Sequence, residues 1–309
     1  VGRLVPDWTR SPFPVILHSG GAQPHEFVVT SFTGTPLFPA ATTSSVTGMT
    51  TPVTARAAAL LRMPLPRDAD AQALADLGLK VTIFDVNEEA GEAHAQAIGG
   101  TFARVDITDE QSVVDGFAAA RAAHGQERVT VHCAMTSRRG KTLGWDKQNN
   151  CYKRLSTEDY AFGAEGILVS SYRVASLSAL GMANAQPVNE DGERGCITLT
   201  ASVAAQDGQI GQVIYGSCKA GVNGLVLPMA RDMMDIGIRV NSIMPGIFAT
   251  PLMLGAPDKV LDSLAASVPF PKRLGKPEEF GSLACEIARN TYLNGHNFRL
   301  DGAIRMAPR

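Results

Sequence analysis

Three side chains in the carboxyl-terminal half have the types and spacing of a proton-transfer site. Tyr215 and Lys219 are four residues apart in a stretch with a helical pattern, so they share one helix face. A free tyrosine titrates at about pH 10, and a neighbouring ammonium group favours the phenolate and lowers that pKa. Ser202 follows a short apolar run, where its hydroxyl can hold the oxygen with which Tyr215 exchanges a proton. These three residues are the predicted catalytic group.

The Tyr-Lys pair has a simpler interpretation. On its own, such a pair is typical of two solvated side chains on a surface helix. The position of Ser202 after a strand, with Gly208 and Gly211 shaping the loop that leads to Tyr215, favours the catalytic interpretation.

The elements that must position these residues alternate between strand and helix. Predicted strands cover residues 81–84, 102–105, 129–132, 196–200 and 238–243, and predicted helices cover 88–98, 110–124, 158–182 and 215–234. Such alternation predicts an α/β fold, a doubly wound parallel sheet of the Rossmann type in a single domain. The chain up to about residue 66 is rich in Thr, Pro, Ser and Gly. We therefore expect an irregular or atypical N-terminal segment at 1–45 and the Rossmann-type domain at 46–309.

Candidate ligand-binding residues follow several predicted strands. Right-handed crossovers place the carboxyl ends of parallel strands at one edge of the sheet, where ligands bind near the topological switch point. Asp85, Asp106, Cys133, Ser202 and Pro245 all lie at or just after a strand end. The five cysteines are scattered without a close pair, so neither a metal site nor a disulfide framework is predicted.

Composition narrows the class of protein. Hydrophobic residues make up 45% and charged residues 19% of the 309 residues, as in an ordinary globular protein. The net charge of -2 provides no basic field for nucleic acid or a membrane surface. No apolar run approaches the roughly 20 residues of a membrane span. We expect a cytoplasmic protein, with the mitochondrial matrix as the alternative, and a small-molecule substrate rather than nucleic acid or membrane as partner.

The segment from Thr200 to Lys219, T-A-S-V-A-A-Q-D-G-Q-I-G-Q-V-I-Y-G-S-C-K, resembles the active-site segment of the short-chain dehydrogenase/reductase family. More narrowly, it resembles the type 2 3-hydroxyacyl-CoA dehydrogenases, which also oxidise hydroxysteroids. The resemblance is nearly gap-free from about Gly195 to the end. It continues through residues 227–232, 237–240, 245–252, 268–275, 293–295 and 299–306.

The resemblance implies NAD as the cofactor. Asp85 matches the family's acid on the adenosine ribose, which accepts from the 2′-hydroxyl and would repel the 2′-phosphate of NADP. Asp106 and Ile107 match the positions beside the adenine ring, and Cys133 matches a residue that lines the cofactor. The other implied cofactor-binding residues are Tyr215, Lys219, Phe248 and Thr250, the last two at the nicotinamide end.

Three departures from the family pattern concern the cofactor site. The Gly-rich turn that approaches the pyrophosphate has only two incomplete candidates, around Gly48 and around Phe27–Thr30 with Gly34. Ile167 stands where the family has the catalytic Asn that anchors a proton-relay water. Met135 replaces a glycine beside the cofactor.

The resemblance implies an NAD-dependent oxidation of a secondary alcohol to a ketone, from 3-hydroxyacyl-CoA to 3-oxoacyl-CoA, in fatty acid metabolism. An acyl-carrier-protein-type ketoreductase is the first alternative, which Asp85 disfavours because such enzymes usually prefer NADPH. A catalytically impaired member acting as a structural or binding subunit is the second, favoured by the missing Gly-rich turn and by Ile167. Family members usually assemble as homotetramers through their long helices.

Overall fold

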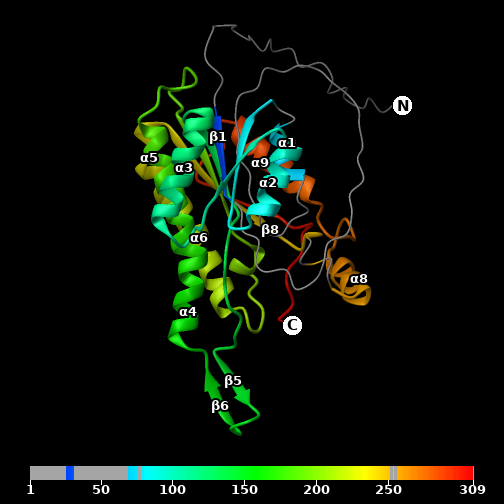
Figure 1. Cartoon of the computed structure of the whole chain (residues 1–309). Helices are drawn as coiled ribbons and strands as arrows, with labels where there is room; N and C mark the ends of the chain where they lie inside the picture. The colour runs from blue at the N-terminus through cyan, green and yellow to red at the C-terminus, as the bar shows by residue number, and fades with distance from the viewer. Residues whose placement is uncertain (1–25, 31–68, 76–77, 251–252, 254–255, 309) are drawn as a thin grey trace, which may run out of the picture.

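A seven-stranded sheet forms the centre of the computed structural model, which describes residues 26–30, 69–75, 78–250, 253 and 256–308. The strands follow the order β3-β2-β1-β4-β7-β8-β9, and all pairs are parallel (Figure 1). Their bounds are β1 Glu26–Thr30, β2 Lys80–Asp85, β3 Thr101–Arg104, β4 Glu127–His132, β7 Gly195–Thr200, β8 Ile238–Pro245 and β9 Asn297–Leu300. The predicted doubly wound parallel sheet is confirmed.

Strand β1 corrects one part of the sequence prediction. It lies within residues 1–45, which were expected to be irregular, yet its backbone pairs with β2 on one side and β4 on the other. For Glu26–Thr30 that expectation is wrong, because the domain includes a central strand from this segment. Of the two candidates for the first strand, Phe27–Thr30 is therefore the one used. The glycines Gly34 and Gly48 lie outside the described residues, and the division of the chain at residue 46 is otherwise still a prediction.

Helices cover both faces of the sheet (Figure 1). One face carries α3, α4, α5 and α6, and the other carries α1, α2 and α9. Their bounds are α1 Ala69–Ala75, α2 Glu88–Ala97, α3 Glu110–His124, α4 Thr157–Ala164, α5 Ser170–Ala183, α6 Val213–Asp232, α8 Asp258–Ser267 and α9 Pro277–Arg289. The core follows this division: Leu74 and Phe280 are buried on the α1–α9 face, and Phe117 and Val222 on the other. The apolar face of each helix thus determines which face of the sheet the helix covers.

The segment from Gly140 to Arg154 contains a β-hairpin that is absent from the predicted strands. Strands β5, Leu143–Asp146, and β6, Cys151–Arg154, pair antiparallel in a separate sheet that projects below the body (Figure 1). Trp145 and Tyr152 lie opposite each other, with ring centroids 5.1 Å apart in an edge-to-face arrangement.

Helices α4 and α5 are joined through a π-helical turn at Glu165–Val169 into one helix. Its length and composition would allow it to cross a membrane, but such composition is also that of a core helix. Val174 and Ala175 are fully buried, and α5 packs on β4 and β7. The helix therefore acts as a core helix in this fold.

Candidate active site

The predicted site residues follow the carboxyl ends of neighbouring strands. Asp106 follows β3, Asp85 ends β2, Cys133 follows β4 and Ser202 follows β7. The direction of strand succession reverses between β1 and β4, which is where ligands bind in open α/β sheets. The sheet therefore brings these residues to one edge.

The side chain of Ser202 lies near enough to the Tyr215 hydroxyl to act on it as a hydrogen-bonding group and to lower the pKa of the phenol. Ser202 caps the short 3₁₀ helix Val203–Ala205, since its Oγ accepts from the backbone N–H of Ala204 at 3.1 Å. Tyr215 lies in the first turn of α6, after a loop that contains Gly211 at φ 86°. The chain thus turns back so that the hydroxyl and the phenol meet, as their spacing predicts.

The pKa of the Tyr215 phenol is raised above its ordinary value, because burial disfavours the phenolate. The hydrogen bond from Ser202 and the charge of Arg139 oppose this shift. Arg139 was not among the predicted site residues. Its only sequence signal is its place in the segment that follows β4, in a basic pair with Arg138.

Lys219 lies one helical turn beyond Tyr215 and is 2% exposed. Its Nζ lies 5.9 Å from the centroid of the Tyr215 ring and donates to the backbone carbonyl of Thr200 at 2.5 Å. Burial lowers the pKa of Lys219 from 10.5 to about 8, against the opposing effect of Cys133. The sequence expectation that Lys219 sets the pKa of Tyr215 gains no support here, because burial, Ser202 and Arg139 determine its direction.

Thr200 connects Lys219 to Cys133. Its carbonyl accepts from Lys219, while its hydroxyl donates to Cys133 Sγ at 2.9 Å. All three side chains are buried. Sequence reasoning missed Thr200, because a backbone carbonyl can be supplied by any residue type and carries no sequence signal.

The acids at the opposite end of the site both receive local hydrogen bonds. Asp85 is fully buried, and its Oδ1 accepts from the backbone N–H of Asn87 at 2.9 Å. Asp106 Oδ1 accepts from Thr108, from its N–H at 2.9 Å and its hydroxyl at 2.7 Å. Ile107 is buried beside it. Their cofactor-binding roles are still predictions.

The residues after β8 turn toward the core. Phe248 is buried in the same core cluster as Cys133, and its backbone pairs with Gly275. A Cβ on Gly275 would come within 2.9 Å of the Phe248 ring, so a larger residue there would require the ring to shift. Thr250 Oγ1 accepts from the N–H of Met253 at 3.1 Å. Their predicted contact with the nicotinamide end is not tested by this arrangement.

Ile167 lies within the π-helical turn and is fully buried. Its carbonyl accepts from the Ser171 hydroxyl at 2.6 Å, and Met135 packs against the core cluster that contains Ile167. At the position where the resemblance implies an Asn, the chain thus has Ile167, whose side chain packs in the apolar core.

A cavity of about 640 Å³ opens beside the Ser202–Tyr215 loop. It is bounded by the base of the β5–β6 hairpin, residues 141–143, and by residues from Ala204 to Ala220. Lys141, Gln209 and Gln212 contribute polar groups to its wall. Its size is that of a site for a small molecule.

This fold and its serine, tyrosine and lysine define a nicotinamide-type oxidoreductase site. Residues 68–304 match the family model described as enoyl-(acyl carrier protein) reductase. The chain belongs to the short-chain dehydrogenase/reductase family, and it is an oxidoreductase enzyme.

Its relatives narrow the comparison. The chain is 42% identical over 242 residues to a 3-hydroxyacyl-CoA dehydrogenase type-2 of Drosophila melanogaster, covering 78% of this chain and 93% of that protein. It is 39% identical over 271 residues to the protein of the same name from Mus musculus, covering 87% of this chain and all of that protein. A crystal structure of 3-hydroxyacyl-CoA dehydrogenase type-2 from Mycobacterium avium is similar with a TM-score of 0.72 and 37% identity, covering 78% of this chain and 92% of that one.

Proposed function

We propose that the chain oxidises 3-hydroxyacyl-CoA to 3-oxoacyl-CoA with NAD. The observation that carries the proposal is the placement of Ser202 near Tyr215, one helical turn before the buried Lys219, whose Nζ lies 5.9 Å from the Tyr215 ring centroid. The names of the relatives support the substrate class. The reaction would belong to fatty acid metabolism.

The described residues include a hydrogen-bonding group that suits NAD. The carboxylate of Asp85 lies at the end of β2, one strand from the switch point, where it would accept from a ribose hydroxyl. A 2′-phosphate would meet the negative charge of Asp85, so NAD is favoured over NADP. When bound, NAD supplies the acceptor for the hydride that leaves the substrate carbon.

The side chains of the site handle the proton that leaves the alcohol. Ser202 holds the substrate oxygen, and Tyr215, ionised to the phenolate, accepts the hydroxyl proton and becomes the neutral phenol. Lys219 has a pKa of about 8, so its ammonium form is present near neutral pH and can stabilise the phenolate before the phenolate takes up the substrate proton. Burial raises the pKa of free Tyr215, so the phenolate needs such positive charge beside it.

Absorbance of NADH during incubation with a short 3-hydroxyacyl-CoA tests the proposal. We expect NADH formation with NAD and much slower turnover with NADP. Absence of NAD binding by calorimetry would overturn the catalytic proposal. Preference for NADP would overturn only the role of Asp85.

A second candidate is a binding or structural subunit without catalytic turnover. Ile167 favours it, because a buried aliphatic side chain stands where the family has an Asn. The same NADH assay separates the two, since this candidate yields a folded protein without turnover.

The assembly we propose is a homotetramer in the cytoplasm. Helices α4, α5 and α6 lie together on one side of the molecule (Figure 1). They expose Phe162, Tyr172 and Leu180 to solvent in a single chain. Such apolar side chains suit burial between copies.

A further inference from the structure

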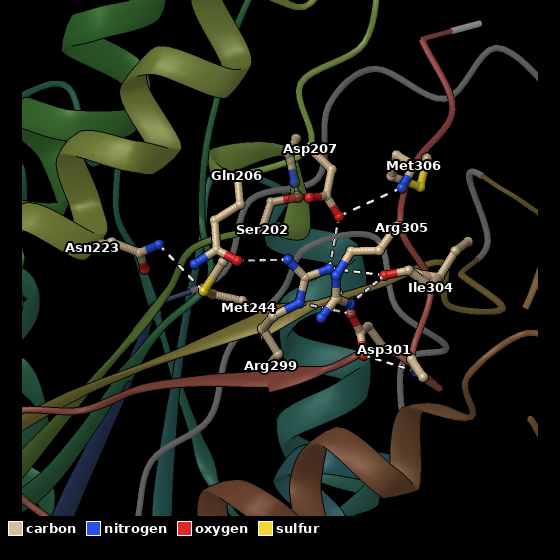
Figure 2. A network of polar contacts seen from close by, with 12 residues as sticks. Ser202, Gln206, Asp207, Asn223, Met244, Arg299, Asp301, Ile304, Arg305 and Met306 are labelled. Atoms are coloured by element: carbon tan, nitrogen blue, oxygen red, sulfur yellow. Dashed lines mark hydrogen bonds and ion pairs between the residues drawn. The ribbon is translucent and has the colours of Figure 1, made fainter. Parts of the chain in front are cut away.

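Arg299 links the loop that follows Ser202 to the carboxyl-terminal tail. Figure 2 shows its guanidinium group between Gln206 and Asp207 on one side and the tail on the other. Nη1 donates to Gln206 Oε1 at 2.6 Å, and Nη2 donates to Asp207 Oδ2 at 2.8 Å. The arginine therefore holds two consecutive loop residues at once.

The guanidinium group is itself fixed from the tail side. Nε donates to Asp301 Oδ2 at 2.8 Å, and Nη2 donates to the carbonyl of Ile304 at 2.9 Å. Asp301 lies directly against Gly246, where an added Cβ would approach it to 2.8 Å. The N–H of Gly246 also donates to the carbonyl of Leu300 at 2.9 Å. Arg299 thus projects from a fixed frame formed by the ends of β8 and β9.

The path from this contact back to Ser202 is short and hydrogen-bonded. The N–H of Ala205 donates to the Ser202 carbonyl at 3.0 Å. The N–H groups of Gln206 and Asp207 donate to the Val203 carbonyl at 3.0 and 2.9 Å. A shift of Asp207 therefore strains the same turn that Ser202 caps.

The tail adds two contacts further along the loop. The N–H of Ile210 donates to the carbonyl of Pro308 at 3.0 Å, and Gln209 Nε2 donates to the carbonyl of Ala307 at 2.9 Å. The loop is thus held on its outer side before α6 begins.

We propose that Arg299 is a positioning residue: by holding Gln206 and Asp207, it sets the place of Ser202 relative to Tyr215. This inference rests on the proposed function, in which those two hydroxyls share the substrate oxygen. Arg299 does not touch the reacting atoms and acts only through the loop.

Two substitutions at Arg299 and one control test the role. Arg299→Gln removes the charge, and Arg299→Lys keeps the charge but loses the forked donor geometry. Arg305→Gln is the matched control, because Arg305 also contacts Asp301 and the Ile304 carbonyl but not the loop. For Arg299→Gln we expect kcat to fall by roughly 10- to 100-fold, because misplaced catalytic groups lose orientation. Arg299→Lys should recover part of that loss.

The Michaelis constant and the pH profile separate positioning from a general loss of structure. The KM for NAD should change by less than about twofold, since Arg299 lies outside the predicted NAD residues. The Ser202 hydrogen bond lowers the pKa of Tyr215, so its weakening should move the rising limb of the kcat–pH profile to higher pH. The proposal would be overturned if kcat fell no more in Arg299→Gln than in Arg305→Gln. It would also be overturned if kcat fell but the rising limb of the kcat–pH profile stayed at the same pH.

Amide hydrogen exchange in the unliganded protein tests the loop without turnover. The N–H groups of Ala205 and Asp207 should exchange faster in Arg299→Gln than in Arg305→Gln. Equal rates in the two variants would overturn the positioning role even if the protein is an active dehydrogenase. Absence of NADH formation by the unaltered protein, with faster exchange in Arg299→Gln, would overturn the proposed function and leave the loop contact established.

Discussion

Lys219 is a cation that the fold holds away from water. Its ammonium group donates a hydrogen bond to the Thr200 carbonyl in the protein interior. Burial lowers the pKa of Lys219 to about 8. A group whose protonated form is disfavoured in the folded state reduces stability wherever the unfolded chain keeps the proton. The residue is therefore expected to be retained for chemistry rather than for stability.

Replacement of Lys219 by Met should abolish NADH formation and stabilise the fold at pH 7. The difference between a pKa of 10.5 and about 8 corresponds to a cost on the order of 3 kcal/mol. The loss of the bond to Thr200 offsets about 1 kcal/mol of the gain. The cost is fully present below pH 8 and decreases as the pH rises toward 10.5, so the advantage of the variant should disappear there. Urea unfolding of the variant and the parent at pH 7 and near pH 10.5 measures the difference in the free energy of unfolding.

The control for that substitution is Lys153→Met, on the exposed strand β6. It should leave both the free energy of unfolding and its pH dependence unchanged. A Lys219→Met variant that is less stable than the parent at pH 7 would contradict the burial argument.

Replacement of Tyr215 by Phe removes the hydroxyl that carries the proton. We expect kcat to fall by roughly 10²- to 10⁴-fold, the usual contribution of a general acid or base. NAD binding, followed by calorimetry, should persist because the ring and Lys219 are retained. Tyr292→Phe is a matched control, since Tyr292 is 95% exposed. Full activity in Tyr215→Phe would assign the proton to another group.

The sequence indicated which side chains lie together at this site, but not their electrostatics. Tyr215 and Lys219 could be found because helical spacing puts them on one face. The direction of the Tyr215 pKa shift could not be predicted, since burial of the phenol raises the pKa and the spacing of the residues does not reveal burial. Thr200 contributes through its backbone, which the residue type does not reveal.

The π-helical turn at Glu165–Val169 determines how closely the α4–α5 helix approaches the segment after β4. Gly166 lies against that segment: the Thr136 N–H donates to its carbonyl at 3.0 Å, and an added Cβ would lie 2.3 Å from the Thr136 carbonyl oxygen. The turn has no evident sequence signal, because its residues also suit an α-helix. By contrast, the bounds of α3 were predicted, since Asp109 caps its start and Gly125 ends it.

Replacement of Gly166 by Ala should therefore destabilise the protein. The backbone oxygen of Thr136 cannot move away as a side chain could, so we expect a loss of roughly 1–3 kcal/mol. Gly224→Ala, in α6 with open space around the added Cβ, is the matched control and should add roughly 0.5–1 kcal/mol. Thermal unfolding of the two variants measures the difference. An unchanged or higher melting temperature for Gly166→Ala would show that the turn adjusts without cost.

At the scale of the whole molecule, the order of the sheet explains what could be predicted. Alternating strands and helices indicated the parallel sheet, because neighbouring parallel strands need crossover connections, which are usually helices. The β5–β6 hairpin was missed, since its strands, Leu143–Asp146 and Cys151–Arg154, are only four residues long and lie in a mostly polar segment. Strand β9 at the edge of the sheet is only four residues long and was not predicted.

The proposed tetramer predicts the effect of a charge on the α4–α6 side. Tyr172→Glu, on α5, should dissociate the assembly in sedimentation experiments, because a buried carboxylate without a partner is costly. Tyr152→Glu places the same charge on the projecting hairpin and should leave the assembly intact. Both tyrosines are exposed in the single chain, at 53% and 73%. Dissociation by Tyr152→Glu alone would place the contact at the hairpin instead.

The central position of strand β1 predicts how a protein shortened at its amino-terminal end would behave. Glu26 pairs with both Lys80 and Glu127, so β1, the earliest strand among the described residues, fills the middle of the finished sheet. A shortened protein that begins at residue 68, where the family match begins, would have a vacant position between two strands with unsatisfied backbone groups on each. Such a fragment should aggregate, and an added peptide that contains Glu26–Thr30 should restore solubility by occupying the vacant position. Strand β1 is thus required to complete the sheet that β2 and β4 form on either side of it.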